Sequence, residues 1–258
     1  MKKVRAKKHL GQHFLKDRGI ASRIADLVDA GPSGIILEIG PGMGVLTRFL
    51  LKKEGKAVHV AEVDSESVAY LESHFPDLEG RIHHEDFLQM DLSRFGAPLD
   101  VMGNFPYNIS SPILFHVLDQ KEHVPYLAGM FQKEVAERVC SGPGSKAYGI
   151  ISVLLQTYYD VTYHFDVPPE VFDPPPKVQS GVMSMQRNER EELGVSYSYF
   201  RTVVRTAFNQ RRKTLHNSLK SLHKGEGLPE AFAKERPEQL SVEGFLTLAQ
   251  VLYERESA

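Results

Sequence analysis

A short apolar run that ends in three alternating glycines constrains the fold of this chain more than any other sequence feature. Residues Ile35–Ile39 have the composition of a buried strand, and Val45–Lys53 places its apolar side chains at helical spacing. Between them, Gly40, Gly42 and Gly44 permit a tight turn in which the backbone approaches a ligand closely. A strand, a glycine-rich turn and a helix in this order predict the ligand-binding start of a Rossmann-like α/β sheet.

The chain beyond this turn continues to alternate between strand-like and helix-like stretches. Strand-like runs are expected at Ala57–Glu62, Arg81–His84, Leu99–Met102 and Tyr126–Phe131. With helices between them, this alternation predicts a parallel sheet that is covered by helices on both faces. Two later runs, Val161–Phe165 and Gln179–Gln186, have no helix between them and are expected to form an antiparallel hairpin at the edge of the sheet.

A charged stretch, Arg187–Gly194, separates this α/β part from a C-terminal part whose pattern is helical from Tyr197 onward. The length of 258 residues is sufficient for one large domain with a small appendage. We therefore predict an α/β domain over residues 1–190 and a small all-helical domain over residues 191–258.

The cysteine and apolar content exclude several classes of protein. Cys140 is the only cysteine, so no internal disulfide is possible, and no cysteine and histidine residues are spaced as metal ligands. No apolar run approaches the roughly 20 residues that a membrane span needs, and the basic N-terminus lacks the apolar segment of a signal peptide. We expect a cytoplasmic protein without a metal ion. No oligomerisation segment stands out, which favours a monomer.

The basic residues are concentrated in two blocks, although the formal net charge is only −2. Residues 1–18 contain seven basic side chains against one acidic side chain, and residues 201–224 contain seven basic and no acidic ones. Either block alone is typical of a solvated surface, but both together on an acidic body indicate a surface that binds RNA phosphates. The candidate phosphate contacts are Lys7, Lys8, Arg211, Arg212 and Lys213.

The glycine turn differs from the fingerprint of dinucleotide-binding proteins. Its glycines follow the spacing G-x-G-x-G, and Glu38 lies two positions before the first of them. This pattern resembles that of class I methyltransferases, which bind S-adenosylmethionine. In such a site, Glu38 is placed to order the turn or to meet the cationic end of the cofactor.

Two further carboxylates follow the next strand-like runs. Glu62 lies 22 positions after Gly40, where an acidic residue grips the hydroxyl groups of a ribose, and Asp64 is a weaker candidate for the same role. Asp86 follows the third strand-like run and is placed to accept a hydrogen bond from an adenine amino group. For Glu62 and Asp86, the alternative is that they are simply polar residues at the end of a strand. The intact turn with Gly40 and Gly42 favours cofactor binding.

The sequence Asn104-Phe-Pro-Tyr107 follows a predicted strand at the edge where α/β sheets bind ligands, and it resembles the Asn/Asp-Pro-Pro-Tyr motif of amino-methyltransferases. The lone pair of an aromatic amine is delocalised into its ring, so its methylation requires acceptors for the two amino hydrogens. We expect these acceptors to be the side-chain carbonyl of Asn104 and the backbone carbonyl of Pro106. Tyr107 offers a flat face for the base. No general base is required, because the proton can leave to solvent after the transfer.

The chain resembles one family along nearly its whole length, the KsgA-type small-subunit ribosomal RNA adenine dimethyltransferases. Besides the glycine turn, the resemblance is carried by four stretches: Lys8–Leu15, Asn104–Ser110, Val171–Val178 and Phe208–Leu215. It implies an S-adenosylmethionine-binding domain followed by an RNA-binding helical domain. It also implies dimethylation of two adjacent adenines in a hairpin near the 3′ end of small-subunit RNA.

The resemblance assigns roles to individual residues. The implied cofactor contacts are His13, Leu15, Gly40, Glu62, Asp86 and Asn104. The target adenine is expected to stack between Tyr107 and Phe172, with burial in the core as the alternative for Phe172. The family usually has Asn in place of His13 and commonly has Leu in place of Phe105. If His13 contacts the cofactor through its side chain, the affinity becomes sensitive to pH.

Other functions share parts of this pattern. A dimethyltransferase of the macrolide-resistance type acts on large-subunit RNA with the same turn and motif, but the basic segment Arg211–Leu215 favours the small-subunit family. A DNA adenine methyltransferase requires a separate, longer target-recognition domain. A mitochondrial transcription factor derived from this fold is disfavoured by the lack of a transit-type extension. A non-catalytic checkpoint on the immature small subunit depends on the basic blocks and not on Asn104.

Overall fold

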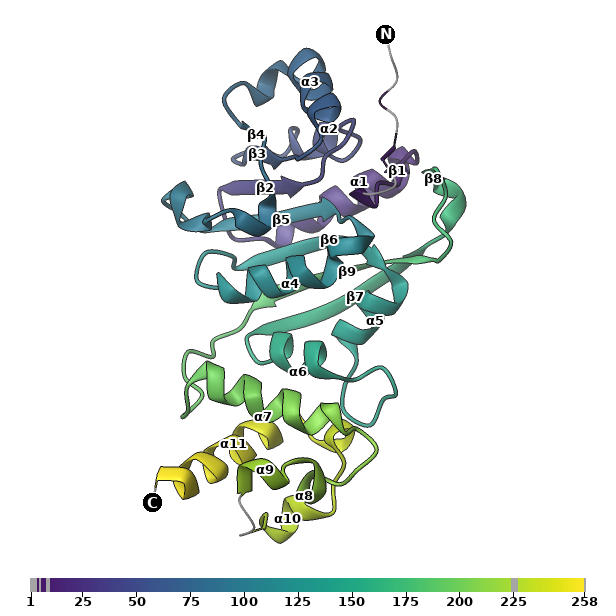
Figure 1. Cartoon of the computed structure of the whole chain (residues 1–258). Coiled ribbons are helices and arrows are strands. Elements are labelled where there is room, and N and C mark those ends of the chain that lie inside the picture. The colour runs from purple at the N-terminus through teal and green to yellow at the C-terminus, as the bar shows by residue number, and fades with distance from the viewer. Residues whose placement is uncertain (1–3, 5, 8–9, 224–226, 258) are drawn as a thin grey trace. The chain divides into compact units, whose positions relative to one another are not determined.

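The computed structural model describes residues 4, 6–7, 10–223 and 227–257. These residues form two compact units (Figure 1). The first unit comprises residues 1–136 and 160–187, and the second comprises residues 137–159 and 188–258.

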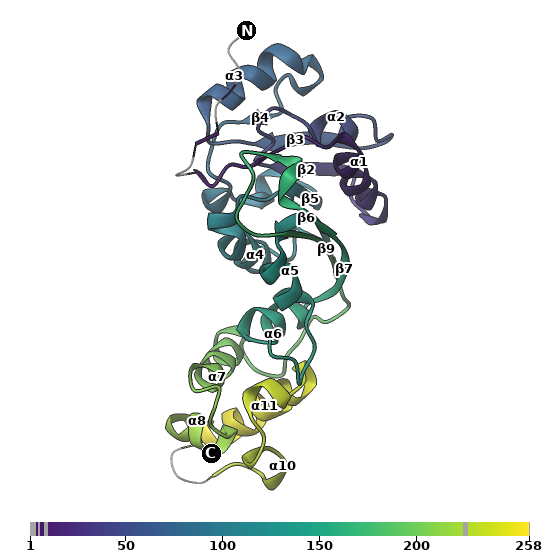
Figure 2. The same ribbon diagram turned by 90° about the vertical axis from the view of Figure 1, so that its right-hand side faces the viewer.

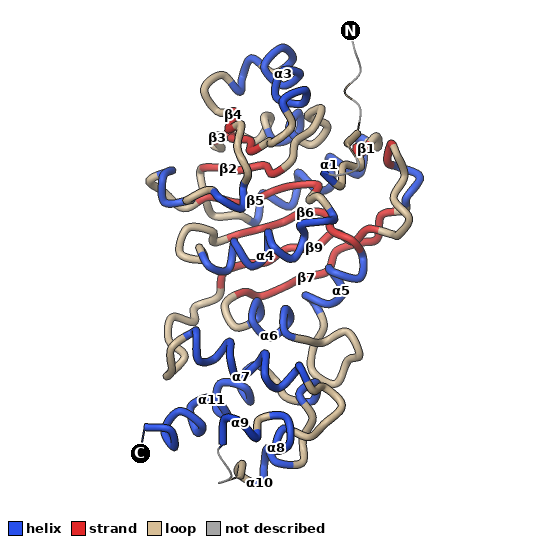
Figure 3. Tube along the Cα trace, viewed as in Figure 1, coloured by secondary structure: helices blue, strands red, loops and turns tan. Residues whose placement is uncertain are grey.

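A seven-stranded sheet with the order β4-β3-β2-β5-β6-β9-β7 is built from the described residues (Figure 3). The strands are β2 (Ile35–Ile39), β3 (Ala57–Ala61), β4 (Ile82–His83), β5 (Leu99–Asn104), β6 (Tyr126–Gln132), β7 (Tyr159–Val167) and β9 (Ser180–Arg187). Neighbouring strands from β4 to β6 are parallel, whereas β9 is antiparallel to β6. The predicted Rossmann-like α/β sheet is confirmed.

Helices cover both faces of this sheet, and Figure 2 shows α1 and α4 on opposite sides of it. The helices are α1 (Arg18–Asp26), α2 (Thr47–Leu50), α3 (Ser65–His74), α4 (Ser110–Asp119) and α5 (Lys133–Cys140). Side chains of alternate strand residues, such as Ile36, Val58 and Met102, form one buried cluster with Ile24 of α1 and Leu50 of α2. Burial of this continuous apolar face is the main source of stability for the unit.

Aspartates fix the beginnings of two helices beside the sheet. Asp17 accepts a hydrogen bond from the backbone N–H of Ile20 at 3.0 Å, and Asp64 accepts one from that of Glu66 at 3.2 Å. Both aspartates have extended backbone, as residues that cap a helix N-terminus do. The caps determine where α1 and α3 begin, and Asp64 is thereby held directly after β3.

The N-terminal segment, residues 10–15, is tied to the proline-rich segment by a small separate ladder. Strand β1 (Phe14–Leu15) pairs antiparallel with β8 (Phe172–Asp173). The backbone N–H of Lys16 extends the contact by donating to the carbonyl of Val171 at 2.8 Å. These residues lie far apart in the sequence, and no periodicity predicted their pairing.

Helices form the second unit. They are α6 (Ile150–Gln156), α7 (Tyr197–Asn209), α8 (Leu215–Ser218), α9 (Lys220–His223), α10 (Glu230–Ala233) and α11 (Val242–Ser257). The predicted helical domain began at residue 191, but the structure adds residues 137–159 to it, because the apolar side chains of α6 are buried and α6 packs against α7. None of the helices in the part of the chain that the structure describes is long and apolar enough to cross a membrane.

Candidate active site

A cavity of about 300 Å³ lies in the first unit, at the carboxyl ends of β2, β3 and β5. Its walls come mainly from residues 10–15, 38–46, 61–63, 85–88 and 104–109. The volume is that of a small-molecule site, and this edge of a parallel sheet is where such folds bind ligands. All eight predicted cofactor contacts line it: His13, Leu15, Glu38, Gly40, Gly42, Glu62, Asp86 and Asn104.

The glycine turn forms one wall of the cavity. Gly40 and Gly42 have φ values of 63° and 54°, which glycine adopts without the strain that a side chain causes. A Cβ atom on Gly42 would lie 2.7 Å from Cε1 of Phe14. The glycine therefore makes room for the N-terminal segment, whose Phe14 ring lies directly against the turn.

Glu62 connects the glycine turn to the loop after β3. Its carboxylate accepts hydrogen bonds from the backbone N–H of Gly42 at 3.1 Å and from that of Asp64 at 2.9 Å. Burial raises the pKa of Glu62, and these backbone hydrogen bonds act in the opposite direction. Each carboxylate oxygen has a further lone pair, so the group can accept hydrogen bonds from the two hydroxyl groups of a ribose.

Glu38 is a buried acid with one unpartnered oxygen. Its side chain on β2 is 1% exposed, and its Oε2 has no hydrogen-bond partner among the residues that the structure describes. Burial raises the pKa of Glu38 to about 8; the hydroxyl group of Thr47 opposes this shift and the nearby Glu62 adds to it. A buried acceptor without a partner, in a residue that lines a cavity, suits a cationic group of a ligand.

Asp86 begins the 3₁₀ turn Phe87–Gln89 by accepting a hydrogen bond from the backbone N–H of Leu88 at 3.0 Å. The residue is exposed and lines the cavity, and its second carboxylate oxygen can accept from an amino group. Val63 and Leu88 line the same cavity and offer apolar contacts for a flat ring. These two were not predicted, although each lies within two residues of a predicted acid.

Asn104 is the last residue of β5, and a hydrogen bond orients its side-chain amide. Its Nδ2 donates to the backbone carbonyl of His13 at 3.0 Å, which leaves Oδ1 as an acceptor. The ring of His13 makes other contacts: its Nδ1 lies 2.8 Å from the carbonyl oxygen of Pro174, and its centroid lies 5.4 Å from that of Tyr107. His13 therefore reaches Asn104 through its backbone and not through its side chain.

The backbone carbonyl of Pro106 does not take the predicted role of acceptor for a substrate amine. It accepts hydrogen bonds from the backbone N–H of Ile109 and from Oγ of Ser110, both at 3.2 Å, which occupies both lone pairs. The cause is the 3₁₀ turn Tyr107–Ile109, which begins directly after Pro106. Phe105, one residue earlier, also lines the cavity, and its carbonyl accepts no hydrogen bond within the described residues.

The ring of Phe105 supports the motif from the core. It is 1% exposed and stacks on Phe131 with a centroid distance of 4.4 Å. Gly103 and Gly129 make room for it, because a Cβ atom on Gly129 would lie 2.5 Å from the Phe105 ring and 2.2 Å from the carbonyl oxygen of Gly103. The backbone of the motif is thus fixed by close packing in the middle of the sheet.

Tyr107 and Phe172 lie in different environments, contrary to the predicted pair of stacking faces. Tyr107 lines the cavity, and its hydroxyl group is hydrogen-bonded to Oγ of Ser180, a fully buried residue at the start of β9. Phe172 is also fully buried, but it belongs to the apolar core cluster with Leu15 and is not a cavity residue. A ring without exposed surface does not offer a face to a base, so the core alternative holds for Phe172 in this structure.

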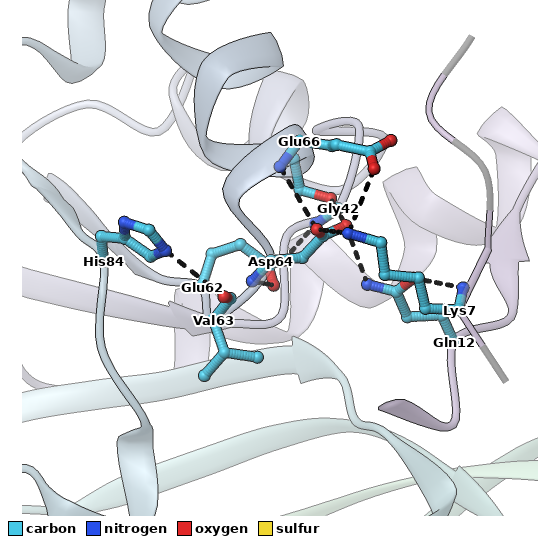
Figure 4. Close-up of polar contacts among 9 residues, drawn as sticks. Lys7, Gln12, Gly42, Glu62, Val63, Asp64, Glu66 and His84 are labelled. Atoms are coloured by element: carbon cyan, nitrogen blue, oxygen red, sulfur yellow. Dashed lines mark hydrogen bonds and ion pairs between the residues drawn. The ribbon is translucent and has the colours of Figure 1, made fainter. Parts of the chain in front are cut away.

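The two predicted N-terminal phosphate contacts are not equivalent. Lys8 lies outside the described residues. Lys7 forms an ion pair with Asp64, and its Nζ also lies 3.3 Å from Oε1 of Glu66 (Figure 4). Its charge is therefore compensated within the first unit, which differs from the prediction that Lys7 contacts RNA.

The C-terminal basic residues lie in the second unit. Arg211 donates to the carbonyl of Ser145 at 3.2 Å, and its Nε lies 3.8 Å from Oε2 of Glu238. Arg212 and Lys213 are exposed, and no ion pair is formed by either within the described residues. Of the three predicted phosphate contacts in this unit, these two are the exposed ones.

Gln12 and Ser180 are polar residues of the site that the sequence reasoning did not assign. Gln12 lines the cavity and donates to Asp64 at 3.4 Å, and Ser180 holds Tyr107. Gln12 lies within one of the stretches that carry the family resemblance, and Ser180 lies two residues after another. Their position in or beside these stretches is the sequence feature that could have indicated them.

Comparison with known proteins identifies the family. A family model described as ribosomal RNA adenine dimethylase matches residues 3–253. The chain belongs to the ribosomal RNA adenine dimethylase family. This dimethylase is 58% identical over 255 residues to the ribosomal RNA small subunit methyltransferase A of Parabacteroides distasonis, with 97% of the chain and 95% of that protein covered.

Two solved structures share the fold of this chain. The dimethylase superposes on a dimethyladenosine transferase from Plasmodium falciparum with a TM-score of 0.79 and 25% identity, over 95% of the chain and 98% of that protein. It superposes on the 23S rRNA methyltransferase ErmE with a TM-score of 0.65 and 24% identity, over 95% of the chain and all of that protein. The second likeness concerns the fold alone.

The cofactor of this dimethylase is S-adenosylmethionine, and the cavity suits its chemistry. The unpartnered oxygen of Glu38 suits a cationic group, Glu62 suits a ribose, and Asp86 suits an adenine amino group. In the part of the chain that the structure describes, no group of three or more His, Cys, Asp or Glu side chains is arranged so that it could hold a metal ion.

Proposed function

We propose that this dimethylase modifies the N6 amino groups of two adjacent adenines in a hairpin near the 3′ end of small-subunit (16S) ribosomal RNA. The proposal rests on the orientation of Asn104. Its side-chain amide donates to the backbone carbonyl of His13 and lies in the cavity that suits S-adenosylmethionine. The name of the 58% identical relative supports small-subunit RNA as the substrate. The proposal includes a monomeric enzyme that acts in the cytoplasm on the immature small subunit during ribosome biogenesis.

The acidic residues of the cavity hold and orient the cofactor. When bound, S-adenosylmethionine supplies an electrophilic methyl group on its sulfonium. Glu38 offers its free oxygen to the cationic amino-acid end, Glu62 accepts from the ribose hydroxyls, and Asp86 accepts from the adenine amino group. The glycine turn leaves space for close approach of the backbone.

Two carbonyl oxygens activate the target amine. Oδ1 of Asn104 and the backbone carbonyl of Phe105 accept the two amino hydrogens, which directs the nitrogen lone pair away from the ring and toward the methyl group. Pro106 keeps the residue before it in an extended conformation, which helps to fix the Phe105 carbonyl. After the first transfer the nitrogen retains one hydrogen, so the second transfer proceeds with one of these two hydrogen bonds.

Aromatic side chains position the base. The ring of Tyr107 offers a stacking face, and its hydroxyl group is anchored by Ser180. The ring of His13 lies beside it with an interplanar angle of 32°. The proton leaves the product nitrogen to solvent, so the residues contribute mainly by holding nitrogen, methyl and sulfur in line.

The second unit is proposed to bind the RNA. The region that we predicted to bind RNA, residues 191–258, contains the exposed Arg212 and Lys213, whose charges suit phosphate groups. Such contacts position a substrate without reading its sequence, and their affinity falls as the salt concentration rises. Arg211 supports them by joining the basic segment to Ser145 and Glu238.

The experiment measures transfer of labelled methyl groups from S-adenosylmethionine to small and large subunits that lack the modification. We expect dimethyladenine in the small subunit alone. Asn104→Ala removes the acceptor and should slow the transfer by on the order of 100-fold or more. Asn104→Asp keeps an acceptor but cannot donate to the carbonyl of His13, so it should also be slow. Thermal unfolding of both variants verifies that they fold.

The outcomes separate the alternatives. Label in large-subunit RNA contradicts the proposed substrate and favours the resistance-type activity, which the fold alone does not exclude. Tight binding to small subunits without methyl transfer by the wild type contradicts the catalytic assignment and favours a non-catalytic assembly factor.

A further inference from the structure

A network of polar side chains closes the N-terminal segment, residues 10–15, over the cofactor cavity. Nζ of Lys7 is bonded to Oδ1 of Asp64 and lies 3.3 Å from Oε1 of Glu66. The backbone N–H of Lys7 donates to Oε1 of Gln12 at 2.8 Å, and Nε2 of Gln12 lies 3.4 Å from Oδ2 of Asp64. Figure 4 shows the side chains of Lys7 and Gln12, which belong to the N-terminal part of the chain, pointing toward Asp64.

Asp64 is a firm anchor for these contacts. Its side chain is fully buried, accepts a hydrogen bond from Oγ of Ser67 at 3.0 Å, and caps α3. Burial alone raises the pKa of Asp64, but the hydrogen bonds from Lys7 and Ser67 outweigh it, so the pKa lies below its usual value. The backbone N–H of Asp64 also donates to Glu62 at 2.9 Å, which links the network to the predicted ribose contact.

The N-terminal segment is therefore fixed at both ends. At one end Lys7 is joined to Asp64, and at the other end β1 pairs with β8 and Lys16 donates to the carbonyl of Val171. Residues 10–15 all line the cavity, and Phe14 packs against the glycine turn. The ladder has only two residue pairs and lies at one end of the segment, so the Lys7 contacts are what ties its other end to Asp64.

We propose that Lys7 is a positioning residue of the cofactor site, which acts through Asp64 to hold the N-terminal segment closed over S-adenosylmethionine. Dimethylation of one adenine consumes two cofactor molecules, so the spent cofactor must leave and fresh cofactor must enter between the transfers. A segment that is closed by a side-chain ion pair sets the rate of this exchange. The inference rests on the cofactor and not on the identity of the RNA.

A phosphate contact is the competing role for Lys7. In the structure its ammonium group faces two carboxylates, which leaves this group of charges negative and unfavourable for a phosphate. The two roles differ in what they predict without RNA. A latch alters cofactor release by the free enzyme, whereas a phosphate contact leaves it unchanged and instead lowers the salt dependence of RNA binding by about one charge.

The test measures release of labelled S-adenosylmethionine from the full-length enzyme without RNA, in a chase with unlabelled S-adenosylhomocysteine. Lys7→Gln should release the label about fivefold faster, and Lys7→Arg should restore most of the retention. Lys16→Gln is the matched control, because it removes the same charge from an exposed side chain near the same segment. In a double-mutant cycle, Lys7→Gln should add little to the effect of Asp64→Asn.

Amide hydrogen exchange of the cofactor-free enzyme gives a second readout. Residues 10–15 should exchange faster in Lys7→Gln than in the wild type, and Lys16→Gln should leave them unchanged. Unchanged release and unchanged exchange in Lys7→Gln, or equal effects of both lysine variants, would overturn the proposal. Because exchange is measured without cofactor or RNA, it decides the latch even if the proposed RNA substrate is wrong.

Discussion

Replacement of Glu38 by glutamine tests whether this buried acid serves the cofactor at the expense of stability. The side chain is 1% exposed, and its Oε2 has no hydrogen-bond partner within the described residues. Glutamine has nearly the same shape but neither ionises nor carries charge. The variant therefore separates the effect of the charge from that of the packing.

The magnitude follows from the pKa. Burial raises the pKa of Glu38 from 4.5 to about 8. This shift corresponds to at most about 5 kcal/mol of difference between the interactions of the protonated and ionised forms with the folded chain. The stability linked to this group is fully present below pH 4.5, declines as the pH rises, and is lost above a pH of about 8.

Urea unfolding of the cofactor-free proteins over the range from about pH 5 to about pH 9 measures this effect. The Glu38→Gln variant should become more stable than the wild type as the pH rises, and the difference should level off above a pH of about 8. A difference in the free energy of unfolding that does not change with pH would refute the reasoning, because packing alone does not titrate.

The Glu38→Gln substitution should weaken cofactor binding, although it stabilises the cofactor-free protein at high pH. A cationic cofactor favours the ionised form of Glu38, so the wild type should release protons on binding below a pH of about 8, and the variant should not. The variant should also bind at least about tenfold more weakly. Calorimetry in two buffers with different ionisation enthalpies measures both quantities. Equal affinity and equal proton release in the two proteins would show that Glu38 does not meet the cationic group.

Two further predictions concern the support of the target site. Ser180→Ala removes the partner of the Tyr107 hydroxyl and should slow methyl transfer about tenfold, as should Tyr107→Phe. In single-turnover assays the double variant should be no slower than either single one, and additive effects would contradict this coupling. Gly129→Ala places a Cβ atom 2.2 Å from a backbone oxygen of β5 and should lower stability by about 2–3 kcal/mol. In Gly34→Ala the nearest atom lies at 3.8 Å, so similar melting of these two glycine variants would refute the steric argument.

The parts of the site that the sequence predicted share one physical property. In a parallel sheet the carboxyl ends of successive strands meet at one edge, so residues that directly follow strands are brought together whatever their distance in sequence. Glu38 lies one residue before the end of β2, Glu62 and Asp86 follow β3 and β4, and Asn104 ends β5; all four line the cavity. The periodicity that predicted the strands therefore also predicted the composition of the site.

The acceptor carbonyl, predicted at Pro106 and now proposed at Phe105, is a feature that strand periodicity does not predict. The motif gives the order of the residues but not the direction of each carbonyl group. That direction is set by the 3₁₀ turn Tyr107–Ile109, whose hydrogen bonds engage Pro106. A short turn has no periodicity of its own, so a sequence pattern does not reveal which backbone oxygen it uses.

Phe172 and Lys7 show a second limit, which concerns pairing between distant segments. An aromatic ring suits both a stacking face and a core, and a lysine suits both a phosphate and a carboxylate. The structure adds contacts between segments far apart in the chain, namely the pairing of β1 with β8 and the ion pair of Lys7 with Asp64, which no local pattern predicts. The same limit explains why residues 137–159, which follow β6 in the sequence and precede most of β7, were not assigned to the helical unit.

His13 explains how the site tolerates a residue that departs from the family pattern. The contact with Asn104 is made by the backbone carbonyl of His13, which any residue at this position supplies. The histidine ring also donates a hydrogen bond from Nδ1 to the carbonyl oxygen of Pro174, since a carbonyl oxygen can only accept. The side-chain amide of an asparagine carries an N–H donor of the same kind. The exchange of Asn for His therefore keeps the orientation of Asn104, and we expect the pH sensitivity of cofactor binding to arise from Glu38.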